Sequence, residues 1–241
     1  MLIILIFAIF CEVVTNALSN FSQAPKNVIL FVGAGLGVST VTAARVARAQ
    51  RKNLENLNSK FTFEEFPHSG LVMTSSYNRH TTDTAAAAMA LFTGWKVENG
   101  YLGVKPGMAN GSCTDDKARI SDGIADMALQ RKMAVGFVTT ASITGATPAA
   151  LYAKDVHYRR EQVKARDGQC ADIASQLLQH PANKFKVLMG GGQHVLLPKK
   201  AGGIRTDSLD LFDEWSKLPG KRNHLLDLDQ FDRYVASDDD H

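Results

Sequence analysis

The sequence predicts an α/β protein with a mostly parallel β-sheet and helices on both of its faces. Short apolar runs alternate with stretches of helical periodicity, and several of these runs end in glycine or in Ser/Thr turns. Strands that read as continuous apolar runs are typical of parallel sheets, which helices bury on both faces. With 241 residues and 45% hydrophobic content, the chain can bury one sizeable core, so we expect one globular domain.

The first half of the chain contains two predicted strands and two predicted helices. Asn27 to Val32 is a run of β-branched and aromatic residues, as in a central strand. A glycine turn at Gly33 to Gly37 leads from it to a predicted helix over Ser39 to Lys52, which begins with a hydroxyl cap. Gly70 to Ser75 is the second predicted strand, and Thr84 to Phe92 is a helix whose alanines permit close packing.

The second half continues the alternation and becomes more polar after Pro198. Its predicted elements are, in order, a helix (Asp122 to Arg131), a strand (Ala134 to Thr139), a helix (Cys170 to Gln179), a strand (Lys186 to Met189) that runs into three glycines, and a helix around Leu209 to Leu218.

The N-terminus has the pattern of a signal peptide. Met1 to Phe10 is an apolar run too short to span a bilayer, and small residues near Ala17 fit peptidase cleavage. We therefore expect a signal peptide over residues 1–17, a domain over residues 18–241 and a secreted protein. A transmembrane anchor is the alternative interpretation of this run. No lipid-anchor signal is recognised at the C-terminus, so no stable membrane anchor is expected.

The net charge limits the classes of partner that the chain could bind, and the cysteine content bears on the cellular compartment. The formal net charge is +3 with scattered basic residues, which argues against nucleic acid and favours a small-molecule or protein partner. Loss of the signal would leave Cys113 and Cys170, which predicts one disulfide, with two free thiols as the alternative. Asn20 and Asn110 lie in N-glycosylation triplets, which fit secretion but also arise by chance.

Three segments are candidates for chemistry. Gly33 to Gly37 is either a loop that presents N–H groups to a phosphate or a tight turn, because the dinucleotide fingerprint needs a glycine where Val38 stands. Thr84, at the first turn of a predicted helix, is a candidate nucleophile, with helix capping as the alternative. The hydroxyls of Thr139 to Pro148 would line a polar site or form an ordinary hydrogen-bonded turn.

Five motifs, in register, resemble the alkaline phosphatase family. Lys26 to Gln50 resembles the segment in which a strand is followed by Gly-Asp-Gly-Met-Gly and Ser-Thr-Val-Thr-Ala-Ala-Arg. Asp83 to Ala86 resembles the Asp-Ser-Ala-Ala segment that carries the nucleophile. The three other matching segments are Val138 to Ala153, Gly168 to Gln176 and Met189 to Gln193. The similarity covers nearly all of residues 26–198 and corresponds to the N-terminal half of the family's chain.

The resemblance implies a three-layer sandwich with a mostly parallel sheet and helices on both faces, here lacking the C-terminal half. Family members are secreted or membrane-anchored enzymes that hydrolyse phosphate monoesters through a phosphoserine, with zinc and magnesium as cofactors. They are typically homodimers, and an arginine binds the phosphoryl group. Secreted members place a disulfide where Cys113 and Cys170 stand, which implies that these two cysteines pair.

Several active-site positions of the family are changed. A metal-binding aspartate matches Ala34, whose methyl group cannot coordinate a cation. The nucleophilic serine matches Thr84, which keeps the hydroxyl. The histidine close to the magnesium matches Gly145, and the phosphate-binding arginine matches Tyr158.

Few candidates remain for the family's site. Arg159 is a candidate phosphate ligand after a one-residue slip, and Thr147 and Asp83 are candidate metal ligands. The other zinc ligands of the family come from its second half, so we expect zinc and magnesium to be lost or weakly bound. The sequence thus favours a catalytically inactive, secreted, alkaline-phosphatase-like protein. The alternatives are a partial sequence of an active enzyme and a truncated product that folds poorly.

Overall fold

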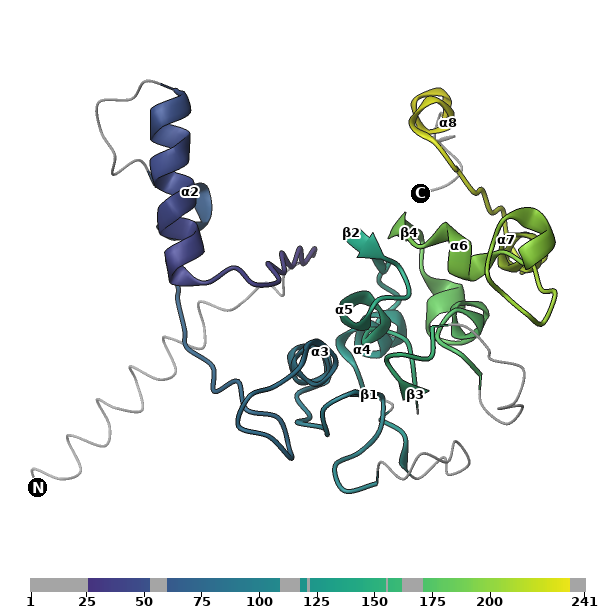
Figure 1. Cartoon of the computed structure of the whole chain (residues 1–241), viewed down its shortest axis with the longest axis horizontal. Helices are drawn as coiled ribbons and strands as arrows, with labels where there is room; N and C mark the ends of the chain where they lie inside the picture. The colour runs from purple at the N-terminus through teal and green to yellow at the C-terminus, as the bar shows by residue number, and fades with distance from the viewer. Residues whose placement is uncertain are drawn as a thin grey trace, which may run out of the picture. The chain divides into compact units, whose positions relative to one another are not determined.

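The computed structural model describes residues 26–52, 60–108, 118–120, 122–154, 156–161 and 171–234 (Figure 1). They divide into two compact units, Met1–Leu71 and Val72–His241. Each unit is built from its own contacts and is described by itself.

The first unit is organised around one helix. Helix α2 (Val38–Arg51) begins after the predicted glycine turn, in which the Leu36 N–H donates to the Gly33 carbonyl at 3.2 Å. The predicted hydroxyl cap is wrong, because the N-cap is Gly37, which has no side chain to cap the helix. A short 3-10 helix, η1 (Thr62–Glu65), packs against it. Arg45 pairs with Glu64 at 3.5 Å, and the Arg48 guanidinium lies 5.2 Å from the centre of the Phe61 ring.

The two strands predicted in the first half of the chain are wrong. Asn27 to Val32 has no regular secondary structure, and its five apolar side chains are 45–87% exposed. Gly70 to Ser75 is also irregular, and Leu71, Val72 and Met73 are at least 84% exposed. A strand exists only where a neighbour accepts and donates its backbone hydrogen bonds. Neither segment has such a neighbour among the described residues.

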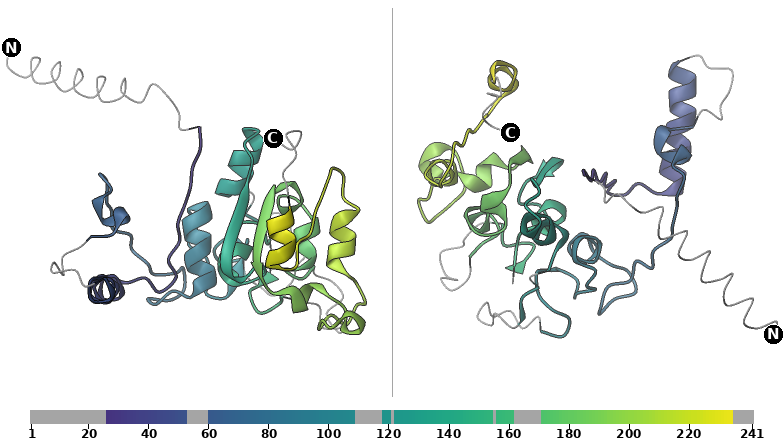
Figure 2. Two further views of the ribbon diagram at one scale, coloured as in Figure 1. Left: turned by 90° about the horizontal axis from the view of Figure 1, so that it is seen from above. Right: turned by 180° about the vertical axis from the view of Figure 1, so that it is seen from behind.

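A parallel strand pair forms the sheet of the second unit, and it confirms the α/β class. Strand β2 (Gly136–Ser142) pairs with β4 (Val187–Gly191), with Gly136 opposite Val187 and Val138 opposite Met189. Figure 2 shows the two strands side by side. The strands predicted at Ala134 to Thr139 and Lys186 to Met189 are therefore confirmed, each displaced towards its carboxyl end.

A second, antiparallel pair lies apart from this sheet. Strand β1 (Tyr101–Leu102) pairs with β3 (Val156–His157), and Tyr101 stands opposite His157 in the register. These two short strands fix the loops that precede and follow them, which matter for the candidate site below.

Helices supply most of the core of the second unit. Helix α3 (Thr84–Thr93) buries alanines together with Met89 and Phe92, and it packs against α4 (Ile124–Gln130) and α5 (Ala146–Ala149). The helices predicted at Thr84 to Phe92 and Asp122 to Arg131 are confirmed. Between the sheet and the helices, the Phe137 ring stacks on Tyr152 at 6.5 Å and meets Phe185 edge-on at 6.3 Å.

The remainder of the second unit consists of short elements. These are η3 (Ser175–Leu178), η4 (Ala182–Lys184), α6 (Gln193–Leu196), η5 (Lys199–Ala201), α7 (Leu211–Ser216) and α8 (Leu228–Arg233). Helix α7 confirms the helix predicted around Leu209 to Leu218, whereas α8 was not predicted.

The helix predicted over Cys170 to Gln179 is only the short 3-10 helix η3, and Cys170 lies outside the described residues. Asp172 explains the difference, because its carboxylate accepts the Ser175 N–H at 2.6 Å in the manner of a cap. The same carboxylate lies 3.1 Å from the fully buried guanidinium of Arg205. Local capping and a buried ion pair therefore replace the first turns of a regular helix.

Candidate functional site

The start of helix α3 carries the predicted nucleophile position. Thr84 is the first residue of the helix and is exposed. The cap of this helix is Asp83, whose Oδ1 accepts the Ala86 N–H at 2.9 Å. Because the neighbouring carboxylate satisfies the helix end, the Thr84 hydroxyl is not required for capping. It stands in the positive field of the helix N-terminus.

The loop before strand β1 brings a second set of residues to this helix start. Asn99 accepts the Asp83 N–H through its Oδ1 at 3.3 Å and donates to the Thr81 carbonyl at 3.2 Å. The next residue, Gly100, accepts the Tyr158 N–H at 2.8 Å. The Asn99-Gly100 loop therefore links Asp83 to the residues that follow strand β3.

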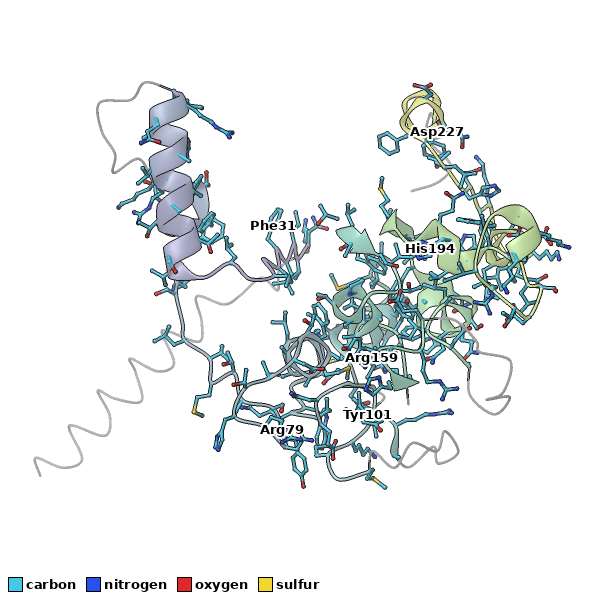
Figure 3. All side chains as sticks on the ribbon, in the orientation of Figure 1. Phe31, Arg79, Tyr101, Arg159, His194 and Asp227 are labelled. Atoms are coloured by element: carbon cyan, nitrogen blue, oxygen red, sulfur yellow. The ribbon has the colours of Figure 1, made fainter. Side chains whose placement is uncertain are left out.

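Arg159 is held by the residue that precedes it, Tyr158. Its Nε donates to the Tyr158 hydroxyl at 3.2 Å, and its guanidinium lies 5.7 Å from the centre of that ring. The side chain is exposed, and Arg159 and Tyr101 lie in the same region of the second unit (Figure 3). The structure thus places a guanidinium on the residue after Tyr158, whose backbone is joined to the start of α3 through Gly100 and Asn99.

His157 is a member of this cluster that the sequence did not identify. Its ring stacks on Tyr158 at 5.0 Å and meets Tyr101 edge-on at 5.3 Å, and its Nδ1 accepts the Arg159 N–H at 3.2 Å. Gly100 admits the ring, since a Cβ there would lie 2.5 Å from Nε2 and φ is +92°. No motif signals this histidine, because its position is set by the register of β1 and β3.

The charge state of His157 follows from its surroundings. Burial lowers the pKa of the imidazole below its ordinary value, and the positive charge of Arg159 lowers it further, while Asp83 opposes both effects. His157 is therefore neutral near pH 7. With Nδ1 accepting a hydrogen bond, Nε2 carries the proton of the neutral ring.

Thr147 and Gly145 belong to a different neighbour of helix α3. Thr147 belongs to α5, which packs against α3, and Gly145 is the residue that precedes α5. The Gly145 N–H donates to the Ser142 carbonyl at 2.9 Å, and a Cβ at Gly145 would lie 3.0 Å from that oxygen. A histidine at this position would require the turn to shift by a few tenths of an ångström.

Hydrogen bonds account for the other hydroxyls after strand β2. The Ser142 and Thr144 hydroxyls lie 2.6 Å apart, and Thr144 donates to a Glu161 carboxylate oxygen at 2.6 Å. Thr144 is fully buried. This part of the segment is a hydrogen-bonded turn, the second of the two interpretations offered by the sequence.

The described residues do not fit a zinc or magnesium site. Among them, no three His, Cys, Asp or Glu side chains come close enough together to hold a metal ion. The Asp83 carboxylate is engaged as a helix cap, and Thr147 offers a neutral hydroxyl. Ala34 lies in the first unit and has no metal-binding atom in its side chain. Asn20, Asn110, Cys113 and Cys170 lie outside the described residues.

The order of these motifs agrees with a comparison against known families. The family model for alkaline phosphatase matches residues 25–232. The chain belongs to the alkaline phosphatase family. Membrane-bound alkaline phosphatase of Bombyx mori is 36% identical over 206 residues, which cover 79% of this chain and 37% of that relative. The human tissue-nonspecific isozyme is 34% identical, over 84% of this chain and 42% of its own length.

Solved alkaline phosphatases share the fold. The enzyme from the Antarctic bacterium TAB5 is 25% identical with a TM-score of 0.56, over 79% of this chain and 45% of that one. The enzyme from a psychrophilic Shewanella has a TM-score of 0.59 at 24% identity, which supports the fold alone. A variant of the Antarctic enzyme has magnesium bound. The chain spans about two fifths of the length of the curated relatives named above.

Proposed function

We propose that this chain is a catalytically silent member of the alkaline phosphatase family that binds phosphate esters beside helix α3. The reaction of the family is the metal-dependent hydrolysis of phosphate monoesters. The observation that carries the proposal is the state of the site around Thr84, which keeps a hydroxyl, and a guanidinium joined to the helix start through the Asn99-Gly100 loop, but few metal donors among the described residues. Ala34, Gly145 and Tyr158 stand where the resemblance implies two metal-site residues and the phosphate-binding arginine.

The missing donors matter because a threonine hydroxyl is a weak nucleophile at neutral pH. In the family, zinc and magnesium supply the charge that ionises such a hydroxyl and stabilises the leaving oxygen. Loss of a metal ligand or of the phosphate clamp is each expected to cost on the order of 10²-fold in rate. Since several are changed together, we infer that turnover falls below detection and that zinc and magnesium are lost or weakly bound.

Phosphate binding depends on groups that the chain retains. Thr84 offers an exposed hydroxyl at the first turn of α3, where the helix dipole favours an anion and the Asp83 carboxylate already caps the Ala86 N–H. Arg159 adds a guanidinium, which is suited to two parallel hydrogen bonds with phosphate oxygens. Tyr158 restricts the guanidinium by a hydrogen bond and ring contact, so the arginine is partly preorganised.

Two measurements on the full chain test this proposal. Hydrolysis of p-nitrophenyl phosphate is followed with zinc and magnesium added, for the parent chain and for Thr84→Ala. We expect no metal-dependent turnover in either protein.

Inorganic phosphate binding is followed by NMR. Arg159→Ala is expected to weaken this binding roughly tenfold or more, with Arg222→Ala as the control. Metal-dependent turnover that Thr84→Ala abolishes would contradict the silent assignment, and phosphate binding unaffected by Arg159→Ala would contradict the binding site.

A second candidate function is an active alkaline phosphatase of which this chain is a partial sequence. The observation that favours it is coverage, because the chain spans 37% of the Bombyx mori relative and 42% of the human one. Coding sequence that continues past His241 with further His and Asp residues would support this alternative. A stop codon at that point would oppose it.

We also propose that the protein is exported. Support comes from the apolar run before Ala17, from the Asn20 and Asn110 acceptor triplets and from the implied pairing of Cys113 with Cys170. Among the described residues, no helix is long and apolar enough to cross a membrane. Mass spectrometry of protein from the medium of secreting cells tests each feature. An intact N-terminus, unmodified asparagines or two free thiols would each contradict the corresponding part of this proposal.

Homodimer formation, typical of the family, is a further proposal that sedimentation would test.

A further inference from the structure

An open hollow of about 510 Å³ lies in the second unit at the end of the sheet where strands β2 and β4 begin. Its wall comes from the end of α4, the turn into β2, the segment around η4 and the residue before β4. The Lys186 N–H donates to the Val135 carbonyl at 2.7 Å and joins two of these segments. The hollow shares no residue with the cluster around Thr84 and Arg159.

The ionisable side chains that line this hollow are three lysines and one histidine, and no carboxylate lines it among the described residues. Lys132, Lys184 and Lys186 line it, and the part of the chain that the structure describes shows no ion pair for any of them. His180 also lines it, with Nε2 3.2 Å from the Asp126 carboxylate. That buried carboxylate lies 3.3 Å from Lys154, so its charge is compensated away from the hollow. The surface therefore favours an anion.

Apolar side chains form the rest of the wall. Leu129 and Met133 are half-buried there, and Ala134 continues the apolar surface towards β2. The volume is within the range of about 300–1,000 Å³ that is usual for small-molecule sites. A hydrated inorganic ion would leave this apolar wall unused, whereas an organic anion would cover it.

The backbone of Lys132 gives a second, independent observation. Its φ is +59°, and it follows helix α4 at a position where the Lys132 N–H donates to the Leu129 carbonyl and the Met133 N–H to the Ala128 carbonyl. Glycine is the usual residue at such a helix end, because a side chain is strained there. Lysine at this position, in place of the usual glycine, adds a charged side chain to the wall of the hollow.

We propose that this hollow binds a small organic anion that carries at least two negative charges on an apolar body. The exposed side chains of Lys132, Lys184 and Lys186 would bring their ammonium groups to the charges, and Leu129, Met133 and Ala134 would contact the body. Because the hollow is separate from the α3 site, this inference does not depend on the proposed function.

The experiment uses the full chain with methionine methyl groups labelled for NMR, so that Met133 reports directly. Naphthalene disulfonate is the probe, because it has two fixed charges on an apolar body and is not a phosphate ester. A saturable shift of the Met133 signal is expected, with binding that weakens as salt is added. Lys184→Gln/Lys186→Gln is expected to weaken binding by roughly three- to tenfold. Lys132→Gly is expected to weaken it while leaving thermal stability equal or higher, since glycine relieves the strain.

The matched control is Lys199→Gln/Lys200→Gln, which removes two exposed lysines from η5. Circular dichroism confirms that each variant is folded. Binding that is unchanged in both Lys132→Gly and the Lys184/Lys186 variant would overturn the proposal, as would an equal loss in the control. Sulfate that binds as tightly as the disulfonate would overturn the role of the apolar wall, and the absence of a saturable shift would overturn the site itself.

Discussion

Asp83 makes two hydrogen bonds at the start of helix α3. Substitutions of Asp83 can distinguish the contribution of its capping oxygen from that of its negative charge. Its carboxylate caps the helix through the Ala86 N–H, and its own N–H holds Asn99. Asp83→Ala removes the cap and is expected to lower the free energy of unfolding by about 1 kcal/mol, or about 2–4 °C in Tm. Asp83→Asn keeps a capping oxygen and is the control. Equal loss in both variants on thermal denaturation would show that charge, not capping, is the stabilising feature.

His157 provides a prediction about pH. Burial and Arg159 lower the pKa of its imidazole, so between that pKa and the unfolded value of about 6.5 the unfolded chain binds more protons. The free energy of unfolding therefore rises with pH across this window. The contribution is fully present above about 6.5 and is lost as the pH falls through the folded-state pKa. NMR titration should give a His157 midpoint below about 6.5.

Two variants identify the cause of that shift. Arg159→Gln should raise the His157 midpoint by removing the neighbouring positive charge, whereas Arg131→Gln, at the end of α4, should leave it unchanged. A midpoint at or above the ordinary value in the parent chain would contradict the buried, stacked environment of the ring.

At the scale of elements, the pairing of β2 with β4 depends on glycine. A Cβ at Gly190 would lie 2.6 Å from Thr139 Cγ2 and 2.8 Å from Ile143 Cγ2. Gly190→Ala is therefore expected to cost about 1–3 kcal/mol of unfolding free energy. Gly70→Ala is the control, because nothing lies within 4 Å of a Cβ there. Chemical denaturation that finds the two variants equally stable would contradict the close approach of the strands.

The elements that the sequence predicted well are those that local information specifies. Helices α2 and α3 have helical periodicity, and β2 and β4 are short apolar runs that pair with each other. Asn27 to Val32 has the same strand pattern but no partner among the described residues, and partners cannot be read from a pattern. The short helix at η3 reflects the Asp172–Arg205 ion pair, which joins residues distant in sequence.

The residues of the candidate site divide in the same way, into those that the local sequence indicates and those that only the fold brings together. Thr84 and Arg159 are predictions that rest on a motif and on a neighbouring position, and Asp83, predicted as a metal ligand, is the cap of helix α3. His157 was missed, because its contacts with Tyr101 and Tyr158 arise from strand register. The hollow near Lys132 was missed too, since it combines residues from four segments.

At the scale of the whole molecule, exposed apolar side chains predict self-association. Val28, Ile29, Leu30, Phe31 and Val32 are 45–87% exposed, and extended apolar segments of this kind pair with other chains. The isolated chain should therefore sediment as a homodimer or a larger oligomer. Ile29→Lys/Phe31→Lys should shift it towards monomer, and Lys26→Gln should not. A cooperative monomer at all concentrations would contradict this prediction and would also exclude a poorly folded product.

The most direct test of the whole account is the metal content of the purified chain. The protein is saturated with zinc and magnesium, dialysed and assayed by elemental analysis, in parallel with Thr147→Ala and Asp83→Asn. We expect far less than one bound ion per chain, and no difference between the parent and the variants. One or more equivalents of zinc, lost in those variants and accompanied by phosphate on Thr84, would contradict it.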